Sequence, residues 1–182
     1  LRIENSAKRT VAVLDGLSLG GGSEFALACQ AIVATPAGSM GFPETAIGIY
    51  PGLGGMIRTA RQIGPELAKY YVFTGKTLSA QDAYDLGLVT KLVDPQELDK
   101  TIQEVCAADK PDKYRSRSIP ERFQEAVKAC SDDNVRTLLQ GKKPEGVSDR
   151  MAESTLKAVS RKAPLAVKKA NELIDKQQDV SI

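Results

Sequence analysis

The chain has 182 residues, which suits one domain, and 42% of them are hydrophobic, enough to build a core. The 25 basic residues nearly balance the 23 acidic ones, so the net charge of +2 gives no reason to expect a nucleic-acid or membrane partner. No apolar run is long enough to cross a bilayer and no segment has the pattern of a signal peptide, so we expect a cytoplasmic protein. The three cysteines have neither disulfide nor metal spacing, so we expect them to be small buried residues.

The first part of the chain alternates short apolar strands with glycine-rich turns. Residues 10–14 and 31–34 are apolar and contain β-branched residues, which predicts two buried strands. Between them, three glycines at residues 20–22 predict a flexible loop, and a helix follows at residues 23–29. A strand, a glycine loop, a helix and a strand in this order favour an α/β fold.

Helices dominate the rest of the predicted structure. A loop or short strand at residues 38–43 leads to Glu44, residues 51–55 form a second glycine-rich turn, and a further strand is expected at residues 88–93. Cap residues, proline positions and apolar spacing predict helices at residues 56–63, 65–73, 80–86, 94–108, 120–130, 133–140, 148–159 and 164–177, with a polar linker at residues 109–118. We therefore expect an α/β part over residues 1–93 and a helical region over residues 94–182.

The glycines at residues 20–22 form the first candidate site. A glycine turn lets the backbone approach a ligand, and the N–H groups at the start of a helix suit an oxyanion or a phosphate. The turn lacks the Lys-Ser/Thr of a P-loop and the spacing G-x-G-x-x-G, so an oxyanion hole for a carbonyl oxygen is the stronger hypothesis. A tight strand-to-helix turn without a ligand is the alternative.

Two glutamates lie beside the glycine-rich turns. Taken alone, Glu24 is typical of a carboxylate that stabilises the first turn of a helix, and Glu44 of an exposed loop residue. Together they provide the components of an acid–base couple next to an oxyanion hole. The sequence contains no histidine, which excludes Ser-His-Asp and Cys-His catalysis and leaves acid–base chemistry to Asp, Glu, Lys, Tyr or Cys.

Three segments with family-like spacing follow one another: VAVLDGLSLGGGSEFALAC at residues 11–29, GFPETAIGIYPGLGG at residues 41–55 and FTGKTLSAQDAYDLGLVTKLV at residues 73–93. Together they resemble the crotonase (enoyl-CoA hydratase/isomerase) superfamily. The resemblance implies a crotonase-like (ClpP/crotonase) spiral of ββα units with a C-terminal helical region, and assembly as a homo-trimer or hexamer. Residues 114–149 are similar to a helical insertion in 3-hydroxyisobutyryl-CoA hydrolases and in hydratase domains fused to a 3-hydroxyacyl-CoA dehydrogenase.

The resemblance also implies roles for individual residues. The family binds acyl-CoA and holds the thioester oxygen between two backbone N–H groups, of which Gly21 matches one. Glu24 and Glu44 match the two glutamates of hydratases, with Glu24 assigned to the water and Glu44 to the α-carbon, although the residues alone do not order these roles. The residues expected to contact the substrate are Leu19, Gly20, Pro43 and Gly52.

Both glutamates and Gly52 favour a hydratase within this superfamily. Hydrolases of the 3-hydroxyisobutyryl type usually lack a glutamate where Glu24 stands and carry an acid where Gly52 stands, and isomerases usually keep only the match to Glu44. The sequence differs from the family pattern at two places: Gln30 stands where Asp is common, and Met56 with Ile57 where Thr-Gln is usual. These differences bear on the subgroup within the family and not on the catalytic chemistry.

The resemblance thus implies an enoyl-CoA hydratase of fatty-acid β-oxidation that needs no cofactor, because coenzyme A is part of the substrate. Residues 38–78 are most like the hydratase domain of the fused dehydrogenase/hydratase proteins. The alternatives are a 3-hydroxyisobutyryl-CoA-type thioester hydrolase and a non-catalytic assembly fragment. The family's N-terminal segment, with the other oxyanion donor, has no counterpart here, so we expect these 182 residues alone to be inactive.

The remaining basic residues are expected at the surface. Arg58, Arg61 and Lys69 are predicted to be solvated or paired surface charges. The cluster of residues 161–162 and 168–169 predicts a solvated helix face, with contact to the phosphates of coenzyme A as the alternative.

Overall fold

The computed structural model describes residues 2–109 and 118–177. Its strands are β1 Val11–Leu14, β2 Leu17–Leu19, β3 Ala31–Ala34, β4 Ser39–Gly41, β5 Leu78–Ser79 and β6 Lys91–Leu92. Its α-helices are α1 Gly21–Ala28, α2 Gly55–Ile63, α3 Pro65–Thr74, α4 Ala80–Asp85, α5 Leu98–Ala107, α6 Gln124–Ala129, α7 Asp132–Leu139, α8 Asp149–Val159 and α9 Pro164–Lys176. Short 3₁₀ turns are η1 Glu44–Ile47, η2 Pro95–Glu97 and η3 Glu121–Phe123. Residues 110–117, which include most of the predicted linker and the start of the predicted insertion, lie outside the described residues.

The described strands form two small sheets. In the first, β3 lies between β1 and β6 and is parallel to both, with Val11 opposite Ala31. In the second, β4 lies between β2 and β5, parallel to β2 and antiparallel to β5. Leu19, the last residue of β2, is opposite Gly41, the last residue of β4. This register brings the first glycine turn beside the chain that leads to Glu44.

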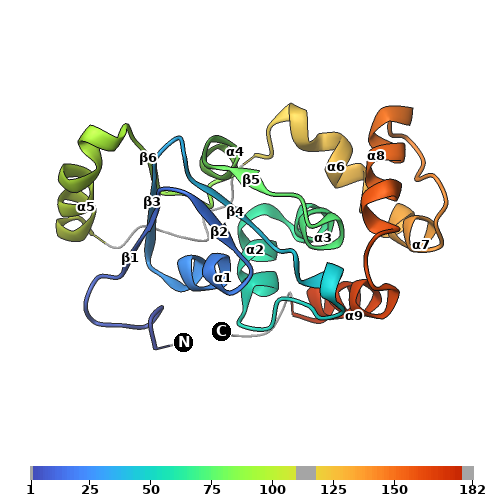
Figure 1. The fold of residues 1–182 in the computed structure, drawn as a ribbon, viewed down its shortest axis with the longest axis horizontal. Coiled ribbons are helices and arrows are strands. Elements are labelled where there is room, and N and C mark those ends of the chain that lie inside the picture. Colours follow the sequence, from blue (N-terminus) through green and yellow to red (C-terminus); the bar gives the residue numbers. More distant parts are fainter. Residues whose placement is uncertain (1, 110–117, 178–182) are drawn as a thin grey trace.

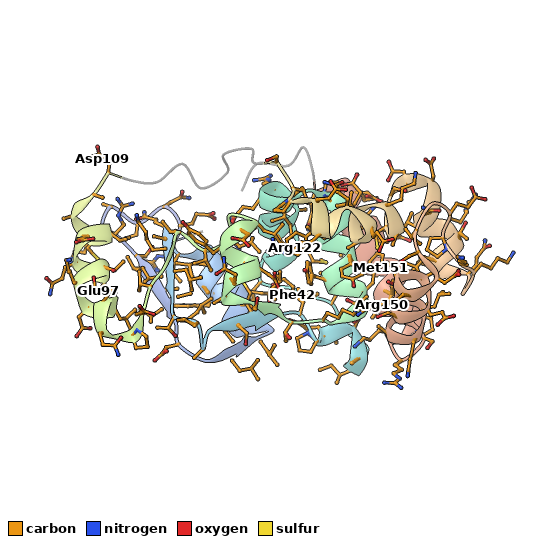
Figure 2. The ribbon with its side chains drawn as sticks, turned by 90° about the horizontal axis from the view of Figure 1, so that it is seen from above. Phe42, Glu97, Asp109, Arg122, Arg150 and Met151 are labelled. Atoms are coloured by element: carbon orange, nitrogen blue, oxygen red, sulfur yellow. The ribbon has the colours of Figure 1, made fainter. Side chains whose placement is uncertain are left out.

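Helices cover the first sheet on both faces. Successive residues of a strand point to opposite sides of the sheet, so the residues of β3 pack alternately against one face's helix and the other's. Val105 of α5 packs on Ala31 and Val33, whereas Ile32 joins the large core that also contains Leu27 of α1. Figure 1 shows α5 at one end of the molecule, α1 to α4 in the middle and α6 to α9 at the other end. Phe42 is fully buried between the two ends (Figure 2).

The helical part is built around α3. This helix packs against α2, α6, α8 and α9. Several local signals in the sequence act as predicted: the side chains of Ser79 and Ser148 cap α4 and α8, accepting hydrogen bonds from Asp82 N and Met151 N. The described strands end at Leu92 and helices follow, but the division at residue 93 into two parts stays a prediction.

Several short elements, such as the following three, differ from the sequence-based expectations. Leu17–Leu19 forms a strand that was not predicted, because three residues between glycines show too little alternation to indicate one. The strand predicted at residues 88–93 is reduced to Lys91–Leu92. The helix predicted from residue 23 already begins at Gly21, because Gly20 alone makes the turn, with φ 54° and ψ −123°, a conformation that favours glycine.

Two basic residues predicted at the surface are buried, so this prediction was wrong for them. Lys69 on α3 is 1% exposed and forms an ion pair of 2.6 Å with Asp175 on α9. Arg58 on α2 is 3% exposed and pairs with Glu4. Buried charges require such partners, and both partners are remote in sequence, so the sequence pattern alone does not reveal them. The prediction that the cysteines are buried is confirmed for Cys29 and Cys130 and was wrong for Cys106, which is exposed.

No helix within residues 2–109 and 118–177 has the length and apolar character needed to span a bilayer.

Candidate active site

The first glycine turn places backbone N–H groups at the start of helix α1. The Gly20 N–H donates to the carbonyl oxygen of Gly41 at 2.9 Å, which fixes the end of β2 against the end of β4. Helix α1 then begins at Gly21, and the first N–H groups of a helix have no acceptor within the helix. Gly21 and Gly22 are exposed. The turn can therefore offer N–H donors to an oxyanion from outside.

Ser23 locks this turn in place. Its buried hydroxyl donates to the carbonyl oxygen of Ser18 at 2.7 Å and lies 3.1 Å from the carbonyl oxygen of Gly41. It also accepts a hydrogen bond from the Gly41 N–H at 3.0 Å. The first turn of α1 is thus tied to β2 and β4 at once. Sequence reasoning missed Ser23, although a polar residue between glycines and a buried helix was a signal.

Glu24 is held by the second glycine turn. Its side chain is 3% exposed, and Oε1 accepts hydrogen bonds from Leu53 N at 2.7 Å and Gly55 N at 2.8 Å. Gly55 is needed for this approach, because a Cβ there would lie 2.7 Å from Glu24 Cγ. Two donors on one oxygen fix the orientation of the carboxylate. They come from 29 and 31 residues further along the chain, so no local pattern predicts them.

Glu44 is the first residue of η1 and is 8% exposed. Burial raises the pKa of its carboxyl above the ordinary value, a hydrogen bond with its own backbone opposes the rise, and the charge of Glu24 adds to it. Oε2 is buried and has no hydrogen-bond partner among the described residues. A buried oxygen without a partner is costly unless a water or a ligand completes it.

The fold brings most of the predicted site residues together. A Cβ on Gly20 would lie 3.0 Å from Glu44 Oε1, and a Cβ on Gly21 would lie 3.8 Å from Leu53 Cδ1. The glycine turn, the 51–55 turn and both carboxylates therefore form one cluster.

The other predicted contact residues lie at its edge. Leu19 is exposed at the end of β2, and Pro43 is half-buried immediately before Glu44. Gly52 is exposed, and the nearest atom that a Cβ there would meet is Tyr50 O at 3.8 Å.

Large apolar side chains in these same segments are exposed. Leu17 and Leu53 are 70% and 72% exposed. Further exposed apolar residues of β2, α1, η1 and the following turn are Leu19, Phe25, Ile47, Ile49 and Tyr50. Such a concentration of apolar surface is typical of a binding or assembly surface.

A separate hollow of about 730 Å³ lies between α7, α8 and α9. Its walls are mostly apolar, and Lys162 and Lys168 of the predicted basic cluster contribute to them. Neither candidate glutamate lines it. Within the described part of the chain, no three side chains of His, Cys, Asp or Glu gather as metal ligands would.

The chain is similar in sequence to several known proteins. A glyoxysomal fatty acid beta-oxidation multifunctional protein, MFP-a of Cucumis sativus, is 45% identical over 98 residues, which are 54% of this chain and 14% of that protein. A short-chain-enoyl-CoA hydratase of Clostridium acetobutylicum is 39% identical over 104 residues, which are 57% of this chain and 40% of that enzyme.

Solved structures share the fold. An enoyl-CoA hydratase from Rhodobacter sphaeroides superposes with a TM-score of 0.79 over 99% of this chain and 53% of its own, at 20% identity. An enoyl-CoA hydratase from Bacillus anthracis has a TM-score of 0.55 and 31% identity, and covers 87% of this chain and 56% of its own. The predicted fold class, α/β of the crotonase type, is confirmed.

The family model described as enoyl-CoA hydratase/isomerase matches residues 1–182. The chain therefore belongs to the enoyl-CoA hydratase/isomerase family. It spans less than half the length of the curated relatives named above.

Proposed function

We propose that the protein is an enoyl-CoA hydratase of fatty-acid β-oxidation and that this chain carries its acid–base pair. The observation that supports this most directly is the cluster of two buried glutamates at the start of α1. One carboxylate is fixed by two backbone donors, and the other has a raised pKa and a buried oxygen without a partner in the described residues. Two carboxyl groups in different environments suit the two proton transfers of a hydration.

The proposed reaction adds water across the double bond of a 2-enoyl-CoA thioester. The thioester oxygen accepts a hydrogen bond from the Gly21 N–H, which stabilises the negative charge as an enolate develops. Glu24 takes a proton from the water whose oxygen bonds to the β-carbon, and Glu44 gives its proton to the α-carbon. The proton gained by Glu24 returns to Glu44 through water before the next turnover.

We assign the contacts with the acyl thioester to the residues at the edge of the cluster. Leu19 and Gly20 precede the proposed oxyanion donor, and Pro43 precedes Glu44, so a thioester held at Gly21 would pass next to them. Gly52 lies in the turn that holds Glu24, where the absence of a side chain leaves room for the attacking water. The exposed apolar residues nearby suit an acyl chain or a neighbouring subunit.

We further propose a homo-trimer or hexamer, in which the exposed apolar surface is covered. Sedimentation of the intact protein tests this, and a monomer would contradict it.

The similarity to a multifunctional β-oxidation protein supports a fused 3-hydroxyacyl-CoA dehydrogenase domain, which the flanking genomic sequence would reveal. A cytoplasmic location remains a prediction, to be tested by cell fractionation, since some relatives are named for glyoxysomes and peroxisomes.

Turnover of crotonyl-CoA by the intact protein separates the candidate functions. Hydration removes the enoyl absorbance without releasing free thiol. Release of thiol would instead support the thioester hydrolase, and an intact, folded protein without turnover would support the assembly fragment.

A further inference from the structure

Arg58 is a buried cation beside the turn that holds Glu24. Its guanidinium group forms an ion pair with Glu4, through Nη2 at 2.9 Å and Nε at 3.2 Å to the same carboxylate oxygen. The remaining nitrogen, Nη1, donates to the carbonyl oxygen of Leu53 at 3.1 Å. Arg58 itself is 3% exposed, and all three contacts are partly buried.

Leu53 is therefore held on both sides of its backbone. Its carbonyl oxygen accepts from Arg58, and its N–H donates to Glu24 Oε1. The adjacent Gly54 has φ 94°, and a Cβ there would collide with Arg58 Nη1. The guanidinium group thus packs against a glycine in a left-handed conformation, in the middle of the segment whose Leu53 and Gly55 N–H groups bind Glu24.

We propose that Arg58 is the positioning residue for Glu24: by holding the Leu53 carbonyl, it fixes the turn whose two N–H groups orient the carboxylate. Arg58 does not touch the reacting atoms, and its effect passes through Leu53 and Gly55. Glu4 anchors the guanidinium group on its other side. This inference rests on the proposed role of Glu24 in the hydration.

Arginine suits this position better than lysine. A guanidinium group has donors in a fixed planar fork, so it can bind Glu4 and Leu53 at the same time, whereas an ammonium group on a flexible chain is a single point charge. Arg58→Lys keeps the charge and loses the fork. It is therefore the informative substitution, with Arg61→Lys on the same helix as the matched control.

The kinetic test uses the intact protein and crotonyl-CoA. Because misplacement of a reacting group by about 1 Å can cost about 100-fold in rate, we expect Arg58→Lys to lower kcat about 10- to 100-fold and to leave KM within about threefold. Arg61→Lys should retain the wild-type kcat. In a Glu24→Gln background, Arg58→Lys should change kcat by less than about threefold, because two residues acting through one group are not additive.

Hydrogen exchange of the backbone amides tests the same inference without any activity. Exchange at Leu53 and Gly55 should be faster in Arg58→Lys than in wild type and unchanged in Arg61→Lys. If Arg58→Lys does not fold, Glu4→Gln, which keeps the Leu53 contact, should show the same changes in exchange and kcat to a smaller degree.

The outcomes separate the two claims. A wild-type protein without hydratase turnover contradicts the proposed function, and the exchange data then decide the role of Arg58 by themselves. Unchanged exchange at Leu53 and Gly55 would overturn the positioning role. So would a loss of kcat in Arg58→Lys that is equally large with and without Glu24.

Discussion

Replacing Glu44 by glutamine tests the proposed proton donor with little change of shape. Oε2 of Glu44 has no hydrogen-bond partner in the described residues, so an amide group at that place breaks no contact seen in the structure. What the substitution removes is the transferable proton. One positioned acid or base typically contributes about 10²- to 10⁴-fold to a rate, or about 2.7–5.4 kcal/mol of activation free energy. We expect Glu44→Gln to lower kcat of the intact protein by that factor.

The pH dependence of the rate gives the same test a second readout. Because burial raises the pKa of Glu44, its carboxyl keeps the proton to a higher pH than an ordinary glutamate does. The wild-type kcat should fall as the pH rises through this raised pKa, since the donor then loses its proton. Glu44→Gln should lack that descending limb.

The assay is the loss of enoyl absorbance from crotonyl-CoA across a pH series, with circular dichroism to verify folding. Glu97→Gln is the control, because Glu97 is exposed in η2, beside α5 at one end of the molecule (Figure 2). It should retain the wild-type kcat and pH profile. A loss of less than about threefold in a folded Glu44→Gln protein would refute the assignment of Glu44 as proton donor.

Two further substitutions, and the thermal stability of Glu44→Gln, give additional predictions. Gly21→Pro should lower kcat about 10²- to 10³-fold or more, because it removes the proposed oxyanion N–H and also distorts the turn at Gly20. An unchanged kcat in a folded protein would show that this N–H is not used. Gly20→Ala should lower both kcat and Tm, because the backbone conformation of Gly20 strains an alanine by about 1–3 kcal/mol and the new Cβ would meet Glu44 Oε1 at 3.0 Å. Gly16→Ala is the control. A Cβ at Gly16 has no neighbour within 4 Å, so this substitution should leave kcat and Tm unchanged. Glu44→Gln should raise Tm at neutral pH. The pKa of the Glu44 carboxyl is raised in the folded protein, so the wild type loses folding stability as the pH rises from 4.5, the ordinary pKa of glutamate, through the raised value. The Tm difference between variant and wild type should therefore shrink as the pH falls below 4.5, and a difference that does not shrink would contradict this.

Local signals explain which elements could be predicted from the sequence. The helices Pro65–Thr74 and Pro164–Lys176 begin at prolines in the first helical position, and Ala31–Ala34 is a short apolar strand between breaks. Leu17–Leu19 could not be predicted in the same way. It is a strand because Ser39–Gly41 lies beside it, and that pairing is a property of the fold.

The residues of the candidate site, too, could be predicted from the sequence only in part. Glu24 and Glu44 could be proposed because each is an acid beside a glycine-rich turn, and the structure brings both to one cluster. Their partners could not be proposed, because Glu24 binds backbone N–H groups, which no side-chain pattern encodes. Arg58 was misassigned for a related reason: its partner Glu4 is 54 residues away, so its burial could not be inferred from its neighbours.

In the proposed mechanism Glu24, Glu44 and the Gly21 N–H act on one acyl thioester. A crystal structure of the intact protein with a non-hydratable acyl-CoA thioester tests it most directly. We expect the thioester oxygen within hydrogen-bond distance of Gly21 N, and one water or ligand atom shared by the two carboxylates. A thioester bound elsewhere, such as in the hollow between α7, α8 and α9, with neither carboxylate in contact with it, would contradict the account.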